Sequence, residues 1–437
     1  MIVMKFGGSS VADAERIKNV AEIVKSKMGR KPVVVVSALG GATDALISIA
    51  KSAQEKKSNG EFAAFFDRHR KAIAELGLKE ELIKGDEEEL TRLIESISVL
   101  NELTSRILDR IFAFGEGMSS KIMAGYMQSI GMPASAYAAY DVGMITDSNF
   151  GEADVLPETE SLIKGAFGHI DGIPVVTGFI GKDMAGNPTT LGRGGSDYTA
   201  SIIGAAIGAE EIEIWTDVDG VMTSDPRIVK SAVSIDRVSY EEASELAFLG
   251  AKVLHPKTIL PAVNKNIPVR VLNTFNPSHK GTVVLKEIEK GSRVASIACK
   301  KGVSVINIYS PNMFGAHGFL KEIFSVFESL KLSVDMVATS EVNVSVTVDE
   351  KHDLKRLVNE LSKIAKVEIR NNRAKISLVG NDMLLMPDLF GKLFMSLKDI
   401  RVEMISSSTS EINQSFVVKQ EQADEAVRRL HMTFFGR

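Results

Sequence analysis

The chain between Gly178 and Ala200 combines the chemical groups that can hold a phosphate. It reads GFIGKDMAGNPTTLGRGGSDYTA and places glycines, an arginine, a carboxylate and hydroxyls beside a predicted helix start. Ser196 or Asp197 can cap the apolar helix that follows. Backbone N–H groups can then face an anion at the positive end of that helix, namely those of Gly192, Gly194 and Gly195.

A second glycine-rich turn, KFGGSS at Lys5–Ser10, follows the first predicted strand. It is not a GxxxxGK[ST] loop, a pattern absent from the sequence. Taken alone, the motif is weak evidence, and a plain strand-to-helix turn explains it. However, its glycines let backbone N–H groups approach a phosphate closely, and its lysine adds a mobile positive charge. The two turns together predict a phosphate-transfer site built from both ends of one domain.

Three further motifs carry candidate site residues, each with a plainer alternative. Thr43 follows a strand in VVSALGGATDAL and can bind a substrate or cap a helix. Glu116 stands between glycines in FGEGMSSK, at what the pattern predicts to be a helix start, and can be a surface carboxylate or a partner for a substrate ammonium. WTDVDGVMTSDPR is partly explained by its Asp-Gly turn. Its other polar residues gather where α/β folds bind ligands, at the carboxyl end of a strand.

The composition is that of an ordinary soluble globular protein. The chain has 437 residues, 44% of them hydrophobic and 25% charged, with a net charge of −4. This balance favours neither nucleic acid nor a membrane surface as a partner. The single cysteine, Cys299, excludes an internal disulfide and fits a reducing compartment. The N-terminus goes straight into a predicted strand, IVMKFGG, so we expect a cytoplasmic protein without a signal peptide. The scattered histidines argue against a zinc enzyme.

The first part of the chain predicts an α/β fold. Continuous β-branched runs, typical of strands buried on both faces, are IVMKFGG, PVVVVSA, IPVVTGFI, EIEIWTDV and IPVRVLN. Helical periods between them predict helices at 14–28, 44–54, 62–76, 86–114, 119–130 and 199–208. This alternation indicates a mostly parallel sheet covered by helices, with the block from residue 51 to 114 as a helical excursion.

After residue 293 the chain predicts two duplicated modules with a β-α-β-β-α-β rhythm. TSEVNVSVTV at Thr339 recurs as TSEINQSFVV at Thr409. The second module lacks a closing strand, which VASIACK, just before the first module, can supply. The second module would then enclose the first in sequence.

Several of these stretches closely resemble those of the aspartate kinases in the amino-acid kinase family. They are KFGGSS, DVGMITDSNFGEA from Asp141, the 178–200 stretch, WTDVDGVMTSDPR and FGAKVLHPKTILPA. The resemblance covers essentially the whole chain. It implies a three-layer α/β/α catalytic domain of the carbamate-kinase type at 1–288. Two α+β, ferredoxin-like ACT domains would follow, the first at 303–374 and the second at 293–302 plus 375–437.

The resemblance also implies an activity. It is the ATP-dependent phosphorylation of the β-carboxylate of L-aspartate to 4-phospho-L-aspartate, the first step towards lysine, threonine and methionine. Mg²⁺ would be carried by the nucleotide, without a dedicated protein metal site. The ACT domains would join a homodimer or a dimer of dimers.

The family's site residues carry over position by position. The ATP phosphates would be faced by Lys5, Gly7, Gly8 and Ser9, and the rest of the nucleotide by Thr216, Asp217, Met222, Arg227 and Lys252. The aspartate side would comprise Thr43, Glu116, Arg193, Ser196 and Asp197. In this scheme Lys5 offsets the transferred charge, Asp197 orients Lys5 or a metal-bound water, and Arg193 and Glu116 hold the α-carboxylate and α-ammonium.

NMFGAHGFL and SVDMVATSEVNVSVT look most like the lysine-sensitive class, so free lysine is the implied effector and threonine the alternative. The implied pocket comprises Met313, Ala316, Gly318, Phe319, Leu320, Val334, Asp335, Ser340 and Glu341. Two other functions stay open. One is a different amino-acid kinase, such as a glutamate or acetylglutamate kinase. The other is a catalytically silent sensor that uses only the ACT modules.

Overall fold

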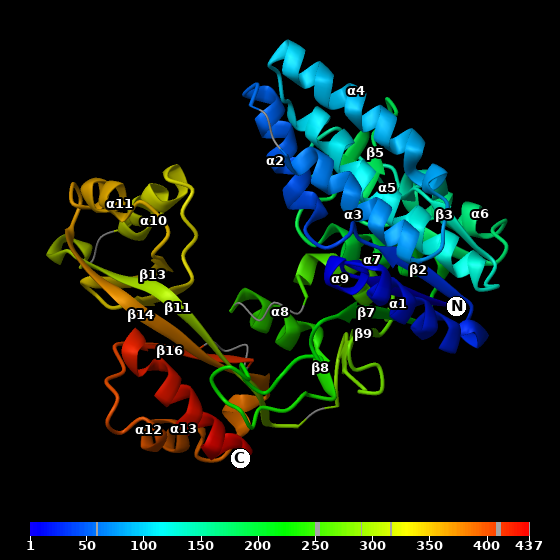
Figure 1. Cartoon of the computed structure of the whole chain (residues 1–437). Coiled ribbons are helices and arrows are strands. Elements are labelled where there is room, and N and C mark those ends of the chain that lie inside the picture. Colours follow the sequence, from blue (N-terminus) through cyan, green and yellow to red (C-terminus); the bar gives the residue numbers. More distant parts are fainter. Residues whose placement is uncertain (58–59, 250–253, 290, 315–316, 408–411, 437) are drawn as a thin grey trace. The chain divides into compact units, whose positions relative to one another are not determined.

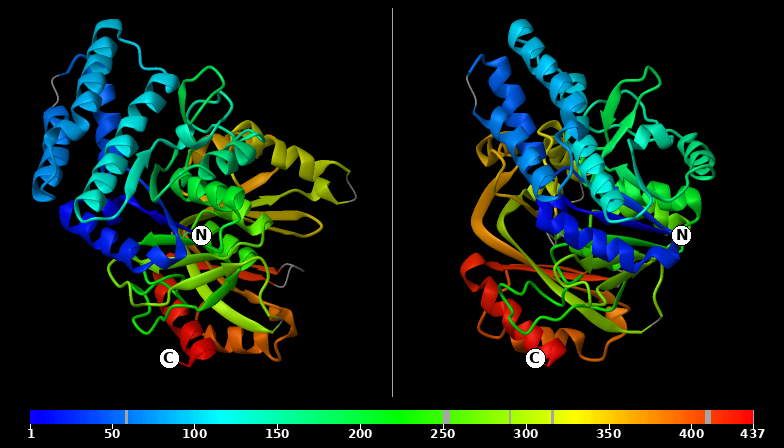
Figure 2. Two further views of the ribbon diagram at one scale, coloured as in Figure 1. Left: turned by 90° about the vertical axis from the view of Figure 1, so that its right-hand side faces the viewer. Right: turned by 45° about the vertical axis from the view of Figure 1, so that its right-hand side comes forward.

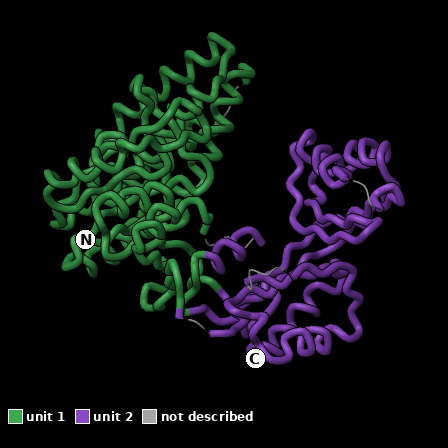
Figure 3. Tube along the Cα trace, turned by 180° about the vertical axis from the view of Figure 1, so that it is seen from behind, with its two compact units in different colours: residues 1–221, 236–240, 253–288 green, residues 222–235, 241–252, 289–437 purple. Residues whose placement is uncertain are grey.

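The computed structural model describes the chain except residues 58–59, 250–253, 290, 315–316, 408–411 and 437. The chain divides into two compact units, coloured separately in Figure 3. The first comprises residues 1–221, 236–240 and 253–288, and the second 222–235, 241–252 and 289–437.

The first unit is built on an eight-stranded sheet with the order β3-β4-β2-β1-β7-β9-β10-β8. Neighbouring strands are parallel except β9 and β10. The strands are β1 (Ile2–Phe6), β2 (Pro32–Val36), β3 (Ala134–Tyr137), β4 (Ile173–Thr177), β7 (Glu211–Thr216), β8 (Arg237–Ser239), β9 (Val269–Asn273) and β10 (Thr282–Leu285). All five predicted runs form strands, and the mostly parallel sheet is confirmed. A short hairpin, β5 (Ile180–Lys182) with β6 (Pro188–Thr190), was not predicted.

Helices cover both faces of this sheet, which confirms the α/β/α layering (Figure 1). On one face α1 (Ala14–Ser26), α2 (Ala42–Gln54) and α5 (Ser105–Ser129) share a core with Met4 and Val34. On the other face lie α6 (Thr159–Phe167), α7 (Gly195–Ile207) and α9 (Pro256–Asn264). The outer helices α3 (Glu61–Glu75) and α4 (Lys84–Leu100) form the expected helical excursion, in which α4 packs beside α5 (Figure 2).

The predicted boundaries within this helical block are wrong. The sequence pattern predicts one helix at 86–114 and another at 119–130, whereas the structure ends α4 at Leu100 and runs α5 unbroken over Ser105–Ser129. Asn101 adopts a left-handed conformation (φ 58°), and the Thr104 side chain caps α5 by accepting from Ile107 N. Gly115 does not break the helix. A Cβ there would lie 3.1 Å from the Ala38 Cβ, so this glycine lets the helix approach the strand–helix turn closely.

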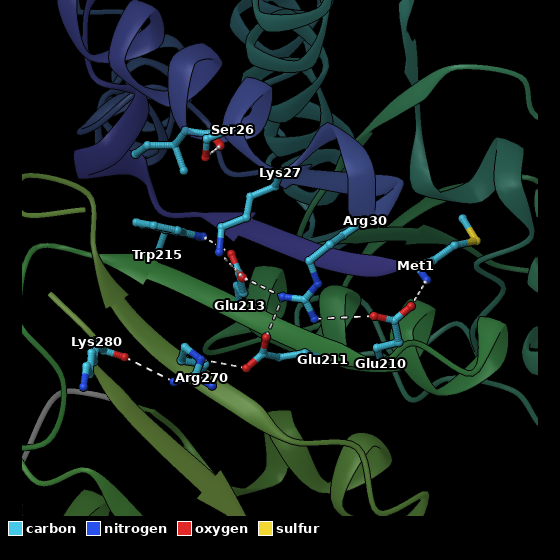
Figure 4. Close-up of polar contacts among 11 residues, drawn as sticks. Met1, Ser26, Lys27, Arg30, Glu210, Glu211, Glu213, Trp215, Arg270 and Lys280 are labelled. Carbon is cyan, nitrogen blue, oxygen red and sulfur yellow. Dashed lines mark hydrogen bonds and ion pairs between the residues drawn. The ribbon is translucent and has the colours of Figure 1, made fainter. Parts of the chain in front are cut away.

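A network of ion pairs ties the residues that follow the C-terminal end of α1 to β7, and β7 to β9 (Figure 4). At its centre the fully buried Glu213 lies 3.2 Å from Lys27 Nζ and accepts a 3.0 Å hydrogen bond from the Trp215 indole. Glu211 pairs with Arg30 at 2.9 Å and with Arg270 at 2.6 Å. A buried carboxylate is tolerated only when such partners compensate its lost hydration.

We expect Glu213→Ala to destabilise the protein by on the order of 1–3 kcal/mol, because it leaves Lys27 and the Trp215 N–H without their buried acceptor. The estimate lies below the usual cost for a broken buried pair because water screens the partly exposed Lys27. Thermal unfolding of the full chain measures the effect. Glu22→Ala is the control, since it removes an exposed pair with Lys25 at 3.6 Å. Equal melting temperatures for the two variants would contradict a structural role for the network.

The second unit contains a six-stranded antiparallel sheet with the order β12-β13-β11-β14-β16-β15. Its strands are β11 (Arg293–Tyr309), β12 (Met336–Thr339), β13 (Asn343–Asp349), β14 (Lys366–Asn381), β15 (Met404–Ser407) and β16 (Asn413–Lys419). Its helices are α10 (Phe319–Ser329), α11 (Leu354–Leu361), α12 (Leu389–Ser396) and α13 (Ala423–Phe435), together with most of α8 (Tyr240–Phe248). Two separate apolar cores lie under α10–α11 and under α12–α13.

The module boundary runs through the middle of two long strands. VASIACK and VSVINIYS were predicted as separate strands but form one continuous β11, with register shifts on both sides of Val303. The first half of β11 pairs with residues 373–381 of β14, which lie beside β16. VASIACK therefore takes the place beside the second module that its repeat pattern predicts.

Candidate active site

A cavity of about 560 Å³ in the first unit collects most of the predicted substrate-binding and catalytic residues. It lies beyond the carboxyl ends of β1 and β2, where parallel sheets bind ligands. Among its lining residues are Lys5, Gly8, Thr43, Glu116, Arg193, Ser196 and Asp197. Residues from opposite ends of the first unit thus meet in one space.

Lys5 and Asp197 form the ionic centre of this cavity. Lys5 Nζ lies 2.6 Å from Asp197 Oδ1, and both side chains are largely buried. Lys5 is the fourth residue of β1, while Asp197 lies in the first turn of α7. The carboxylate of Asp197 fixes the position of the Lys5 ammonium by this ion pair. Lys5 therefore directs a positive charge at the cavity.

The start of α7 differs from its prediction. The helix begins at Gly195 rather than Thr199, and its N-cap is Gly194 in a left-handed conformation (φ 73°) with no side-chain cap. The predicted caps serve other partners, because Asp197 pairs with Lys5 and Ser196 Oγ accepts a 3.0 Å bond from Ser37. The Gly195 N–H donates to Gly192 O at 3.1 Å, so it does not face an anion as predicted.

Glu116 is buried in the middle of α5, not at a helix start. Its Oε1 accepts a long hydrogen bond of 3.3 Å from Ala38 N. Burial raises the pKa of this carboxyl to about 8, because the low-dielectric surroundings disfavour its charge and the backbone hydrogen bond only partly compensates. Such a carboxyl is poised to ionise when a cation arrives beside it.

The remaining predicted residues on the nucleotide side are more scattered. Gly7 and Ser9 flank Gly8, which lines the cavity, but do not line it themselves. Gly7 N donates to Trp215 O at 3.3 Å, and the Ser9 carbonyl accepts from Arg16. Thr216 ends β7, the neighbour of β1, and donates to Asp217 at 3.2 Å.

Three residues predicted to bind the nucleotide are not among the described residues of the first unit. Met222 and Arg227 belong to the second unit, where Arg227 is 89% exposed and held by Asp225 at 2.7 Å. Lys252 falls outside the described residues.

Several cavity residues were not predicted from the sequence. Phe112, Gly151, Glu152, Phe179 and Thr190 also line the cavity. They come from α5, from an irregular loop, and from the β5–β6 region. Phe179 has a positive φ of 69°, which is costly for a bulky residue, and its ring lies 6.0 Å from Phe112. Gly151 and Glu152 lie in the stretch DVGMITDSNFGEA, and Phe179 and Thr190 in the 178–200 stretch, but neither motif by itself gives these residues a role in the cavity.

A larger cavity of about 700 Å³ lies elsewhere against α5 and lacks the predicted chemistry. Its charged side chains largely neutralise one another, since Lys121 pairs with Asp86 at 2.6 Å and Arg110 with Glu89 at 2.7 Å. We therefore assign the site by its chemical groups rather than by cavity size.

The predicted effector residues lie together in the second unit. Gly318 is the left-handed N-cap of α10, while Met313, Phe319 and Val334 pack against the core beneath that helix. Leu320, Ser340 and Glu341 are exposed. Asp335 is nearly buried and already pairs with Lys300 Nζ at 2.5 Å, a partner that was not predicted. Ala316 falls outside the described residues.

The described residues offer neither a metal-binding cluster nor a membrane-spanning helix. No group of three or more His, Cys, Asp or Glu side chains there could hold a metal ion. Within the same residues, no helix combines the length and the apolar character that a membrane crossing needs.

Comparison with known proteins gives matches along the whole chain. The amino acid kinase family model matches residues 1–273, and an ACT domain model matches residues 306–363 and 376–434. Chloroplastic aspartokinase 1 of Arabidopsis thaliana is 40% identical over 99% of this chain and 80% of its own length. Lysine-sensitive aspartokinase 3 of Escherichia coli is 34% identical over 100% of this chain and 99% of its own.

Solved structures agree with these matches. E. coli aspartokinase III in complex with lysine and aspartate superimposes with a TM-score of 0.82 at 32% identity, covering 100% of this chain and 99% of that one. The same enzyme in complex with aspartate and ADP gives a TM-score of 0.80, also at 32% identity, with full coverage of both chains.

Proposed function

The chain belongs to the amino acid kinase family, and on that premise we propose that it transfers the γ-phosphoryl group of ATP to the β-carboxylate of L-aspartate. The observation that carries this proposal is the single cavity that joins Lys5, Glu116, Arg193 and Asp197. Relatives similar over the whole chain are aspartokinases, and one of them binds aspartate and ADP.

The geometry suits a reaction that depends on positioning and charge rather than on a covalent protein group. Glu116 would accept the substrate ammonium and Arg193 would clamp the α-carboxylate, leaving the β-carboxylate to attack the phosphorus. Lys5, held by Asp197, would offset charge on the transferred group while the bond to the ADP oxygen breaks. Mg²⁺ bound to the ATP phosphates would supply further charge neutralisation.

A hydroxamate assay with ATP and Mg²⁺ tests the proposal. Aspartate should give the aspartyl hydroxamate, while glutamate and acetylglutamate should give little. Preference for glutamate or acetylglutamate would favour the other amino-acid kinases. No turnover with any acid, combined with lysine binding, would favour the silent sensor.

We further propose that free lysine inhibits the enzyme by binding the turn at 313–320 and the strand and loop at 334–341. The solved relative in complex with lysine supports lysine as the effector. Since Asp335 already pairs with Lys300, an effector ammonium would have to share or displace that lysine. Inhibition then requires that lysine bind a less active arrangement more tightly, a difference of typically ~1–3 kcal/mol.

We expect Asp335→Ala and Glu341→Ala to raise the lysine concentration needed for half inhibition by about 5- to 150-fold, since each removes an acceptor for an effector ammonium. Inhibition curves at fixed aspartate measure this. Asp349→Ala is the matched control, because Asp349 also lies near Lys300 Nζ, at 3.3 Å, but outside the proposed pocket. The same shift in the control would mean that freeing Lys300, rather than losing an effector contact, causes the change.

The domain division given by the resemblance stays a proposal, as does assembly through the ACT domains. Apolar residues exposed on the second unit support assembly, among them Val337 of β12, Ile405 of β15 and Phe394 of α12. We expect sedimentation of the full chain to show a dimer or a dimer of dimers, and a chain that stops near residue 290 to dissociate. A stable full-length monomer would contradict this. The cytoplasm remains our proposed location.

A further inference from the structure

Asp109 is a buried carboxylate that connects three walls of the candidate active site. It lies on α5, two helical turns before Glu116, and is 1% exposed. Its Oδ2 accepts hydrogen bonds of 2.9 Å from Gly151 N and of 2.9 Å from Thr190 N. Its Oδ1 accepts a 2.8 Å bond from Thr190 Oγ1. Asp109 does not line the cavity, but both of its partners do.

Thr190, a hydrogen-bond partner of Asp109, is close to Arg193 in the chain. Thr190 ends β6 three residues before Arg193, and its carbonyl accepts from Ala153 N at 2.8 Å. The next turn is tightly packed, because a Cβ on Gly192 would lie 3.2 Å from Glu152 Cγ. The loop at 151–153 and the end of β6 therefore form one body, and Asp109 attaches this body to the helix that carries Glu116.

We propose that Asp109 is a positioning residue that sets the separation between Glu116 and Arg193. In the function proposed above, these two groups hold the ammonium and carboxylate on one substrate carbon, so their separation must be fixed to a fraction of an ångström. Burying a carboxylate costs free energy unless hydrogen bonds replace its lost hydration. Asp109 has three such bonds, and they join α5, the loop at 151–153 and the end of β6 into one polar network. The inference rests on the proposed function.

Two substitutions separate the hydrogen bonds from the charge. In Asp109→Asn the amide oxygen can accept both backbone N–H groups while the NH₂ donates to Thr190 Oγ1, so the junction survives. Asp109→Leu has a similar shape but no acceptor, and it leaves two buried N–H groups unpaired. We expect the KM for aspartate to change by less than about threefold in the Asn variant and to rise by about tenfold or more in the Leu variant.

Further readouts exclude a merely structural effect. In Asp109→Leu the KM for ATP should stay near that of the wild type, and the preference for aspartate over glutamate should fall, because the α-carbon is held less firmly. Thr159→Val is the matched control. It removes a hydroxyl that is 1% exposed and bonded to the Ile145 carbonyl at 2.9 Å, away from the cavity. Thermal unfolding of both variants shows whether they are comparably destabilised.

The kinetics of these variants distinguish a failure of the inference on Asp109 from a failure of the proposed function. If Asp109→Leu and Thr159→Val change the aspartate KM equally, or if Asp109→Leu raises the KM values for ATP and aspartate alike, Asp109 has no positioning role. If Arg193→Ala raises the aspartate KM but Asp109→Leu does not, only the inference on Asp109 fails. If Arg193→Ala itself leaves the aspartate KM unchanged, the proposed division of the site fails instead.

Discussion

Replacing Lys5 with alanine should lower kcat by about 100- to 1,000-fold, which corresponds to roughly 2.7–4 kcal/mol of lost transition-state stabilisation. Lys5 is directed at the cavity by its 2.6 Å ion pair with Asp197, so its charge requires no reorganisation during the reaction. Because this charge matters most when the phosphoryl group is in transit, the KM for aspartate should rise far less than kcat falls. Steady-state kinetics with each substrate varied in turn measures both quantities.

Two further variants show whether the charge itself is responsible. Lys5→Arg keeps a cation but replaces a compact ammonium with a planar group, and we expect it to recover only part of the activity. Asp197→Asn keeps the shape of the partner and removes its charge, so it should lower kcat by orienting Lys5 less firmly. Near-normal turnover in a folded Lys5→Ala protein would contradict the assignment of Lys5.

The parts of the site that could be predicted are those encoded locally. Lys5 lies near the end of a strand that the sequence shows as an apolar run, and Ser196 and Asp197 follow a glycine-rich turn, so the local pattern marks all three as candidates. The α/β class was predictable for the same reason, since buried parallel strands appear as continuous apolar runs. The repeat in the second unit was predictable because the same short pattern occurs twice.

The parts that could not be predicted depend on distant contacts. The proposed role of Asp109 depends on its hydrogen bonds with Gly151 and Thr190, which lie 42 and 81 residues away along the chain. Glu116 was expected at a helix start because glycines flank it, yet Gly115 serves close packing against Ala38. In the same way, no sequence pattern pairs Lys300 with Asp335 across the sheet of the second unit.

Replacing Glu116 with glutamine, or Arg193 with alanine, should mainly weaken the use of aspartate. Glu116 is buried, so Glu116→Gln removes one partner of a desolvated charge pair, a loss of on the order of 2–5 kcal/mol that should raise the aspartate KM by about 30-fold or more. Arg193 is exposed, so water screens its charge and Arg193→Ala should raise the aspartate KM by less than Glu116→Gln does. The KM for ATP should change little, because neither side chain is expected to contact the nucleotide. A loss of ATP affinity with unchanged aspartate binding would show that the division of the site is wrong.

Glu116 should also make aspartate binding depend on pH. Burial raises its pKa to about 8, so at neutral pH the free protein holds this carboxyl mainly in its neutral form, whereas the substrate ammonium requires the carboxylate. The aspartate KM should therefore fall as the pH rises from 6 towards 8, and Glu116→Gln should remove this dependence. A wild-type KM that does not vary over this range would contradict the role given to Glu116.

The same pKa predicts that the folded protein becomes less stable over the pH range in which it binds aspartate more tightly. The unfolded chain releases the Glu116 proton near the ordinary pKa of 4.5, whereas the folded protein retains it until about pH 8. The folded state therefore binds more protons between these values, and the contribution of Glu116 to stability falls as the pH rises through this window. Glu116→Gln lacks this loss, so its melting temperature should gain on that of the wild type between pH 5 and pH 8. A constant difference between the two proteins would show that Glu116 is ionised in the free enzyme, and that the pH dependence of aspartate binding must arise from another group.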